Sequence, residues 1–245
     1  MKCLNPIVSK QHKFVPCGKC LYCRMRRNFE WQTRLLLESV THKFNYFVTL
    51  TYNDDHCDGL LHKQHLKLFC DDMRRATKDF RFYAVGEYGS RTHRPHYHLH
   101  VFTDIPYKQF RKFVKTYWNR GFYYIGGTSA KSIAYVCKWH NVPKENGEQH
   151  GFASMSSGLG REWCDRNEVT YKYRDGIKIG GMYRHFPRYV RDRFGQSPVE
   201  DDFDLFEIQR YYQEIFGGSL THSQWTDICD QLEYDFVNNS KHSKL

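Results

Sequence analysis

The sequence predicts an α+β fold with a central antiparallel sheet whose elements follow the order β-α-β-β-α-β. Four stretches combine β-branched and aromatic residues with alternation, and two stretches between them place apolar residues at helical spacing. This order is that of a split βαβ, or ferredoxin-like, sheet. The four predicted strands are residues 44–52, 80–87, 96–102 and 122–125, and the two predicted helices are residues 62–77 and 107–119.

The chain that precedes the sheet is a Cys-rich and basic segment, residues 1–43, with a predicted helix at residues 24–42. The first strand follows at residues 44–52, because FNYFVTLTY alternates and is rich in β-formers. A polar turn then leads to the helix at residues 62–77. Its apolar residues at helical spacing are Leu66, Phe69, Cys70 and Met73.

The two middle strands form the centre of the predicted sheet. Residues 80–87 and 96–102 alternate, and a loop rich in Gly, Arg and Pro joins them as in a hairpin. The helix at residues 107–119 has an apolar face and leads to the last strand. Residues 129–140 are expected to form a further helix with Ser129 as its N-cap. We therefore expect one domain at residues 44–197.

The remaining residues carry weaker signals. Residues 141–160 are rich in Gly, Ser, Asn and Pro, which predicts a loop. Residues 161–195 are basic and irregular, with a strand pair expected around Asp175 and Gly176. Residues 198–245 are an acidic C-terminal tail with helical patterns at residues 203–216 and 221–236.

Charge is unevenly distributed along the 245 residues, which carry a formal net charge of +10. The tail has ten acids and three bases, which leaves +17 for residues 1–197. A body this basic and aromatic indicates nucleic acid as a partner, although a basic surface kept for solubility is the alternative. No apolar run approaches the about 20 residues that span a bilayer, and the N-terminus lacks an apolar signal segment. We expect no membrane partner.

Three histidines in the strand at residues 96–102 form a candidate metal site. His96, His98 and His100 share one face because side chains alternate along a strand. Glu87 ends the neighbouring strand, so hairpin pairing brings its carboxylate near the same ion. Two imidazoles and one carboxylate leave coordination positions open and suit Mg²⁺ or Mn²⁺ with phosphate oxygens. A polar sheet face with stacked histidines is the alternative.

Tyr135 is a candidate nucleophile on the last predicted helix. A Tyr hydroxyl can form a covalent intermediate, but its pKa near 10 means that it needs help at neutral pH. Lys138 lies three residues later on the same helical face, where its ammonium could favour the phenolate and phosphate charge. A Tyr among Ile133, Ala134 and Val136 is otherwise usual for a core residue with a polar tip.

Three of the nine cysteines fall within seven residues, at Cys17, Cys20 and Cys23. With Cys3 as a fourth ligand they could hold a structural Zn²⁺ ion in a Cys₄ site. Reduced cysteines that pack a loop against the following helix are the alternative, and the sequence leaves both open. The odd number of cysteines and the missing signal segment argue against a disulfide framework.

At this point the motifs resemble those of the HUH endonucleases and, more narrowly, of the replication initiators of gokushovirus-type microviruses. The resemblance covers residues 1 to about 195. The motifs of the HUH type are Phe47–Tyr52, Gly86–Gly89, Arg94–His98 and Tyr135–Lys138. Those of the narrower group are Pro16–Arg24 with Trp31 and Arg34, Gly158–Gly160, and Pro187–Tyr189.

The resemblance implies an HUH-type palm and a role for each matching residue. His96 and His98 would be the metal-binding pair, Glu87 the third ligand, and His100 a spare ligand or surface residue. Tyr135 would attack the scissile phosphate with help from Lys138. Many relatives carry a second Tyr four residues later, where this chain has Trp139. The residues expected to contact DNA are Thr49, Thr51 and Tyr52 on the first strand, and Arg24, Arg26, Arg27, Arg91 and Arg94.

The implied activity is rolling-circle initiation by metal-assisted nicking and joining of single-stranded DNA at a viral origin. A 5′-phosphotyrosine link and a free 3′-OH would form, host replication machinery would extend the 3′-OH, and the protein would work in the cytoplasm of a bacterial host cell. Two alternatives remain. One is a non-catalytic, zinc-containing single-stranded DNA-binding protein, and the other is a related HUH transposase or relaxase.

Overall fold

The computed structural model describes residues 3, 6–8, 10, 14–89, 92–138 and 151–196. The chain divides into two compact units, one of which is Asn28–Pro198, while the other includes residues 1–27. The acidic tail expected at residues 198–245 lies outside the described residues, as do Arg91 and Trp139. The domain boundaries at residues 43 and 197 stay predictions.

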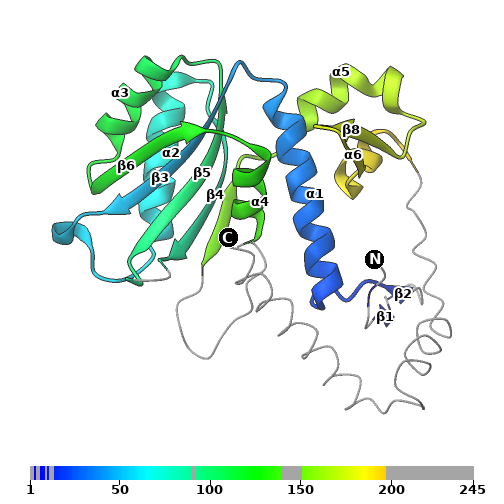
Figure 1. Cartoon of the computed structure of the whole chain (residues 1–245), viewed down its shortest axis with the longest axis horizontal. Helices are drawn as coiled ribbons and strands as arrows, with labels where there is room; N and C mark the ends of the chain where they lie inside the picture. Colours follow the sequence, from blue (N-terminus) through cyan, green and yellow to red (C-terminus); the bar gives the residue numbers. More distant parts are fainter. Residues whose placement is uncertain are drawn as a thin grey trace, which may run out of the picture. The chain divides into compact units, whose positions relative to one another are not determined.

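The larger unit is built on a five-stranded antiparallel sheet with the strand order β6-β3-β5-β4-β7 (Figure 1). Without its edge strand β7, this sheet has the strand order of a ferredoxin-like fold. The predicted α+β class and the predicted order of elements are therefore confirmed. The strands are β3 Phe44–Tyr52, β4 Arg81–Tyr88, β5 Pro95–Thr103, β6 Gly121–Gly127 and β7 Phe152–Met155.

Helices α2 (Lys63–Thr77) and α3 (Tyr107–Tyr117) cover one face of the sheet. The apolar residues predicted to share one face of α2 are all buried in the core between this helix and the strands. Every second residue of β3 points into the same core, as the alternation of its sequence requires. The β3 residues that do so are Tyr46, Val48, Leu50 and Tyr52.

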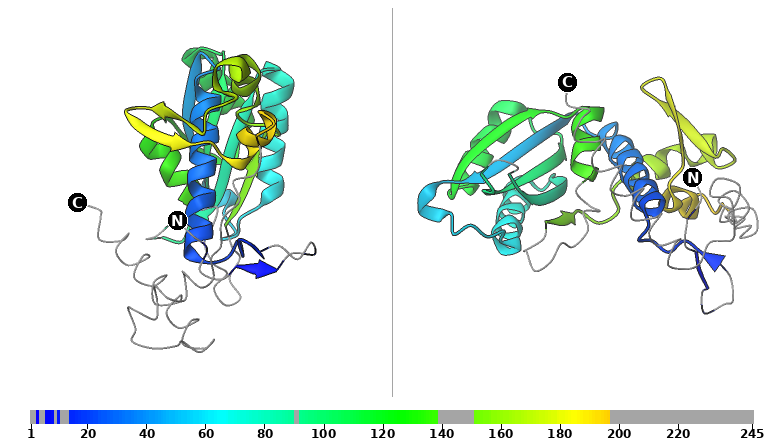
Figure 2. Two further views of the ribbon diagram at one scale, coloured as in Figure 1. Left: turned by 90° about the vertical axis from the view of Figure 1, so that its right-hand side faces the viewer. Right: turned by 60° about the horizontal axis from the view of Figure 1, so that its bottom comes forward.

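Helices α1 (Leu21–Ser39) and α4 (Ala130–Lys138) pack on the opposite face of the sheet (Figure 2). Leu35 of α1 and Ile133 and Val136 of α4 are buried against Tyr83 and Phe102 of the sheet. Helix α4 covers only part of this face. The strands beyond its edge stay accessible, and the candidate site lies there.

The other side of α1 packs against the C-terminal part of the larger unit, where two expectations were wrong. Residues 152–155 form strand β7 instead of loop, because the free edge of β4 pairs with them although their own strand signal is weak. Residues 161–171 form helix α5 (Arg161–Tyr171), which has only Trp163 and Cys164 buried. Ion pairs at i,i+4, among them Arg161–Asp165 and Lys172–Glu168, support this weakly amphipathic helix.

A hairpin and a short helix, α6 (Arg188–Arg193), complete this part of the unit. Strands β8 (Gly176–Ile179) and β9 (Met182–His185) pair as a hairpin, as expected near Asp175 and Gly176. The turn lies a few residues later, at Gly180 and Gly181, whose φ angles of 58° and 81° are those of a type I′ turn.

The described part of the N-terminal unit contains two short strands, β1 (Ile7–Val8) and β2 (Phe14–Val15), followed by the first turns of α1. The sequence analysis did not predict these strands, because two-residue pairs leave no periodic pattern. Within the described residues, no helix combines the length and the apolar character needed to cross a bilayer.

Three of the sequence motifs quoted for the narrower resemblance meet in space around Arg34. Its guanidinium lies 4.2 Å from the centre of the Trp31 ring and 4.0 Å from that of Tyr189, and its Nε donates to the carbonyl of Leu159 at 3.1 Å. Gly160 follows with a φ of +84°, which favours glycine. These motifs thus hold the C-terminal part of the unit on α1, at a distance from the histidine strand in sequence.

Glu38 forms a buried ionic network beside this contact. Its carboxylate accepts hydrogen bonds from the Arg81 side chain, from His42 Nε2 at 3.3 Å and from the Gly160 amide at 2.6 Å. Burial raises the pKa of Glu38, but these hydrogen bonds outweigh it and hold the pKa below its usual value of 4.5. The ionised carboxylate therefore joins α1, β4 and the loop before α5.

We expect Glu38→Gln to lower the free energy of unfolding by about 2–4 kcal/mol at pH 7, because it leaves Arg81 short of a charged partner. Since the folded-state pKa is depressed, this contribution is present above the unfolded-state value of 4.5 and is lost as the pH falls through the lower folded value. Urea denaturation at pH 7 and at decreasing pH measures the difference. The exposed Glu162→Gln is the control and should change stability by less than about 0.5 kcal/mol. A pH-independent difference would contradict this assignment.

Candidate metal and nucleophile site

Antiparallel pairing arranges the accessible sheet face into rows of directly opposed residues. One row runs Glu87, His96, Thr51 and Phe122 across β4, β5, β3 and β6. The next row runs Val85, His98, Thr49 and Tyr124, and the third runs Tyr83, His100, Phe47 and Gly126. Because opposed residues point to the same side of a sheet, these side chains share one face. The third row is buried under α4 and α1, while the first two rows lie at the edge of α4.

Glu87, His96 and His98 form a cluster in the first two rows. Glu87 Oε1 lies 3.0 Å from His96 Nε2 and 3.0 Å from His98 Nε2, and one ligand atom of each residue lies within 4.8 Å of the others. Glu87 is buried, with 3% of its surface exposed, although it ends a strand. The three residues that the sequence predicted as metal ligands are thus brought together.

The hydrogen bonds behind the two imidazoles suit metal binding. His96 Nδ1 donates to the carbonyl of Arg94 at 3.0 Å, and His98 Nδ1 lies 2.9 Å from Thr49 Oγ1. Partners on the far nitrogen orient a ligating ring and leave Nε2 for the ion. Glu87 Oε2 is buried and has no hydrogen-bond partner among the described residues, which is costly unless a cation or proton lies there. The donor set therefore fits a divalent ion.

The charges of the cluster are strongly coupled. Burial raises the pKa of Glu87, but hydrogen bonds from His96, His98 and Tyr135 and the charge of His98 outweigh it and lower the pKa to about 2. Burial lowers the pKa of His96, but its hydrogen bond to Glu87 raises it above the usual 6.5. The site thus holds an ionised carboxylate at neutral pH.

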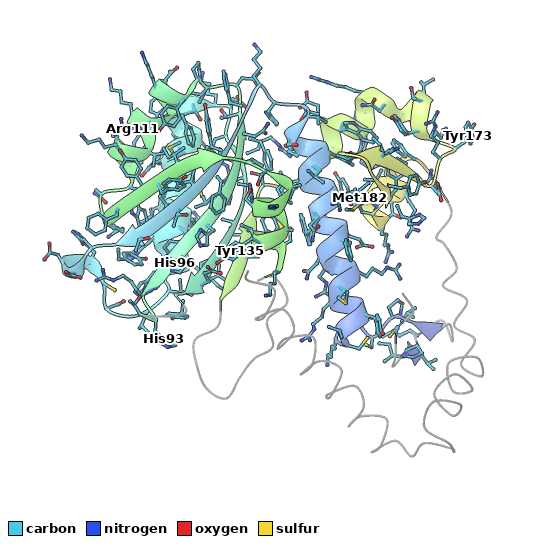
Figure 3. All side chains as sticks on the ribbon, viewed as in Figure 1. His93, His96, Arg111, Tyr135, Tyr173 and Met182 are labelled. Atoms are coloured by element: carbon cyan, nitrogen blue, oxygen red, sulfur yellow. The ribbon has the colours of Figure 1, made fainter. Side chains whose placement is uncertain are left out.

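Tyr135 of α4 reaches into the same cluster from the helix side. Its hydroxyl donates to Glu87 Oε1 at 2.8 Å, and its ring meets that of His98 edge-on at a centroid distance of 5.5 Å. Figure 3 shows Tyr135 and His96 lying close together although they come from a helix and a strand. With 42% of its surface exposed, Tyr135 is not the core residue that its apolar neighbours suggested.

The remaining residues of the predicted nucleophile motif divide between two sides of α4. Lys138 lies with Tyr135 on the exposed face, as their spacing of three residues predicts. Val136 and Cys137 are buried against the sheet.

Other tyrosines lie farther from Glu87. Tyr124 stands on β6, two strands from His98, and Tyr123 packs on the opposite face of the sheet. Tyr171 packs with Trp163 and Phe186 in the C-terminal part, and Tyr173 is 92% exposed beside the hairpin (Figure 3).

His100 does not join the cluster. It is fully buried, its Nδ1 lies 3.2 Å from Thr128 Oγ1, and its ring packs against Phe47. Burial lowers the pKa of His100 to about 4. The structure thus places it under α4 as a neutral core residue, in the third row.

The residues expected to contact DNA fall into different places. Thr49 and Thr51 share the face of the cluster. Tyr52 points to the other face, where its hydroxyl lies 2.6 Å from that of Tyr97 in the core. Arg94 forms an ion pair with Asp54 at the start of the hairpin loop. Arg24, Arg26 and Arg27 lie on the first turns of α1 in the N-terminal unit.

The same unit brings together the four cysteines of the predicted zinc site. One sulfur from each of Cys3, Cys17, Cys20 and Cys23 lies within 4.8 Å of the others. Cys3 and Cys23 are buried, and Cys17 and Cys20 are partly exposed.

Two aromatic side chains on the site face were not singled out by the sequence analysis. Phe122 and Tyr124 are 66% and 63% exposed at the edge of the sheet. They continue the rows of His96 and His98 beyond Thr51 and Thr49. The alternation of FYYI could have revealed them, because Tyr123 and Ile125 take the core face.

Comparison with known proteins places this geometry in a family. Residues 45–142 match the family model of the replication-associated protein ORF2, and this range contains the whole cluster. The chain is 28% identical to the replication-associated protein ORF2 of Spiroplasma virus 4, over 90% of this chain and 79% of that protein. It is 26% identical to the replication-associated protein ORF4 of Chlamydia phage 1, of which it spans 64%, and 24% identical to the replication-associated protein VP4 of Bdellovibrio phage phiMH2K, of which it spans 78%.

A solved structure, the hypothetical protein ORF119 from Sulfolobus islandicus rod-shaped virus 1, is 19% identical to 44% of this chain with a TM-score of 0.31, a likeness too small to support an argument. The relatives align with more than the sheet, since each covers at least 90% of the chain. The chain belongs to the microvirus-type replication-associated proteins of phages.

Proposed function

We propose that this protein initiates rolling-circle replication by nicking and rejoining single-stranded DNA at a phage origin. One observation carries the proposal: the Tyr135 hydroxyl lies 2.8 Å from the Glu87 carboxylate oxygen that both His96 and His98 also contact. A potential nucleophile, a metal-binding set and an accessible face thus converge at one point. The names of the relatives support a role in replication rather than in transposition or conjugation.

The proposed reaction exchanges one phosphodiester for another. The Tyr135 oxygen attacks the scissile phosphorus, the bond from phosphorus to the 3′ oxygen breaks, and a 5′-phosphotyrosine link and a 3′-OH result. The phenolic proton, which points at Glu87, leaves as the new bond forms, and the 3′ oxygen gains a proton. A divalent ion, Mg²⁺ or Mn²⁺, held by Glu87, His96 and His98 would polarise a non-bridging phosphate oxygen.

The reverse reaction explains how such a protein can rejoin DNA. The phosphotyrosine link is itself a phosphodiester, so a 3′-OH that attacks it restores the DNA backbone without ATP. Lys138, on the same helix face as Tyr135, would stabilise the negative charge that gathers on the phosphate oxygens. We propose that the 3′-OH is extended by host replication enzymes and that the protein acts inside the host cell.

A covalent-adduct assay tests this function. The full chain is incubated with single-stranded origin DNA and Mn²⁺, and the products are run on a denaturing gel. A 3′-end label should move with the protein, and a 5′-end label should report a shorter fragment that ends in a 3′-OH. Chelation should abolish cleavage but leave much of the binding, because basic side chains make most phosphate contacts.

No adduct on any of a panel of phage-origin oligonucleotides, with binding intact, would instead support a non-catalytic single-stranded DNA-binding protein. The supply of Mn²⁺ and the two labels keep these outcomes apart, because binding is measured on a native gel with the same DNA.

Phe122 and Tyr124 are expected to stack against bases of the bound strand. They are exposed, and they extend the rows that begin at His96 and His98. Because stacking contributes about 1–3 kcal/mol per base, each Ala substitution should weaken single-stranded DNA binding by about 5- to 150-fold. Fluorescence anisotropy with a labelled oligonucleotide measures this loss.

Tyr107→Ala is the matched control for these two variants. Tyr107 is 49% exposed on α3, which covers the opposite face of the sheet, and its loss should leave DNA binding unchanged. Equal effects of all three substitutions would contradict a stacking role, since only two of the side chains lie on the site face.

A further inference from the structure

The N-terminal unit holds four cysteine sulfurs at the separations of a metal site. Cys3 Sγ lies 3.5 Å from Cys17 Sγ and 3.8 Å from Cys20 Sγ, and Cys17 Sγ lies 3.9 Å from Cys23 Sγ. A disulfide would bring two sulfurs to about 2.0 Å, and none of these pairs is bonded. Four thiolates around one zinc at about 2.3 Å would lie about 3.8 Å apart, the edge of that tetrahedron.

Backbone amides point at these sulfurs as they do around thiolates. The Cys17 amide donates to Cys3 Sγ at 3.3 Å, and the Cys20 and Lys19 amides donate to Cys17 Sγ at 3.3 and 3.5 Å. Such hydrogen bonds favour the charged form of the acceptor, which is the form that binds metal. Packing of neutral thiols against a helix would not require three amides to converge on two sulfurs.

The turn between the ligands is built by Gly18. Its φ of +72° lies in the left-handed region, and it lets the chain reverse so that Cys17 and Cys20 face the same point. The Gly18 carbonyl accepts a hydrogen bond from Arg27 Nη2 at 3.3 Å, which ties the turn to the second turn of α1. Cys23 comes from the first turn of the same helix.

The segment also has little else to hold it together among its described residues. Ile7 and Val8 are 51% and 60% exposed, and the buried hydrophobic side chains described before Asn28 are Cys3, Leu21 and Cys23. Two of these three are themselves members of the cluster. Segments that bury so little apolar surface usually depend on a metal or a disulfide.

We propose that Cys3, Cys17, Cys20 and Cys23 bind one structural Zn²⁺ ion that folds the segment from residue 3 to the start of α1. Soft thiolates select zinc over the hard ions suited to the Glu87 cluster, so the two sites hold different metals. Binding displaces four thiol protons and leaves the site with a net charge of −2. Arg24, Arg26, Arg27 and Lys19 lie in the same stretch of sequence and carry the opposite charge. The proposal does not depend on DNA cleavage.

Metal analysis of the full-length protein, purified under reducing conditions, tests the proposal. Elemental mass spectrometry should find about one zinc ion per chain. Cys20→Ser should bring zinc down to background, whereas Cys57→Ser, at a partly buried thiol in the larger unit, should keep it. Glu87→Gln should also keep it, which separates this site from the proposed catalytic one.

Two measurements on the unmodified chain cover the case in which Cys20→Ser does not fold. A mercurial reagent should release the zinc as about four thiols react. Trypsin should cut at Lys19 and Arg24 faster after the zinc is removed than before. Absence of zinc, iron in its place, zinc that is lost in Glu87→Gln, or four thiols that react without any release would each overturn the proposal.

Discussion

Replacing Tyr135 with phenylalanine is expected to abolish the covalent protein–DNA adduct, with a loss of at least about 10³-fold in nicking rate, because it removes the proposed attacking oxygen. Single-stranded DNA binding should change by less than about threefold, since the ring remains and one neutral hydrogen bond is lost. The side chain is 42% exposed, so the fold does not depend on it. The measurement is the denaturing gel with 3′-labelled origin DNA, alongside a native gel for binding.

Tyr124→Phe is the matched control for this variant. Tyr124 is also exposed on the site face, but it lies two strands from His98. It should still form the adduct. If the adduct survives in Tyr135→Phe, the nucleophile is another tyrosine, and peptide mapping of the adduct would identify it among Tyr123, Tyr124, Tyr171 and Tyr173.

Glu87→Gln should eliminate metal-dependent nicking. A neutral amide cannot offset the charge of a divalent ion, and it offers one acceptor oxygen where His96, His98 and Tyr135 all converge. Loss of a supporting partner alone weakens metal sites by about 10- to 100-fold, so loss of a ligand should weaken Mn²⁺ binding by about 100-fold or more. Titration calorimetry with Mn²⁺ on the DNA-free protein measures the affinity, and the adduct assay measures nicking.

Glu162→Gln is the control, because Glu162 lies exposed on α5 and should affect neither readout. DNA binding at moderate salt should persist in Glu87→Gln, since removal of one acidic group does not remove any phosphate contact. Nicking that remains at the normal rate, or Mn²⁺ binding that is unchanged, would show that the ion is held elsewhere.

Much of the sheet could be predicted from the sequence because its signals are local. The alternation of β3 and β5, the Gly- and Arg-rich hairpin loop and the apolar face of α2 each define an element without reference to the rest of the chain. The order of those elements then admits few topologies, and the observed strand order is one of them.

The elements that escaped prediction depend on long-range partners. Strand β7 exists because β4 has a free edge, and α5 relies on surface ion pairs more than on a buried stripe. The interaction of Arg34 with Trp31, Leu159 and Tyr189 joins residues more than 120 positions apart. Sequence spacing carries no information about such contacts, although each residue was noted in a motif.

The candidate site was predictable in part for the same reason. Strand alternation groups His96 with His98, and hairpin pairing adds Glu87 opposite His96. The same alternation, applied to β3, would have turned Tyr52 toward the core and away from the site. The approach of Tyr135, 48 residues after Glu87, depends on how α4 crosses the sheet, and no spacing in the sequence reveals that crossing.

The parallel rows of side chains on the sheet also set a length. Neighbouring strands lie about 4.8 Å apart, so His96 on β5 and Phe122 on β6 stand about 10 Å apart, with Thr51 between them. Stacked nucleotides rise about 3.4 Å each, so this span corresponds to about three of them. The sheet would then act as a ruler, and origin bases that matter for recognition are expected within about three nucleotides of the nick. Strand spacing is the same in every β-sheet, so related phages can change their origin sequence without changing this distance.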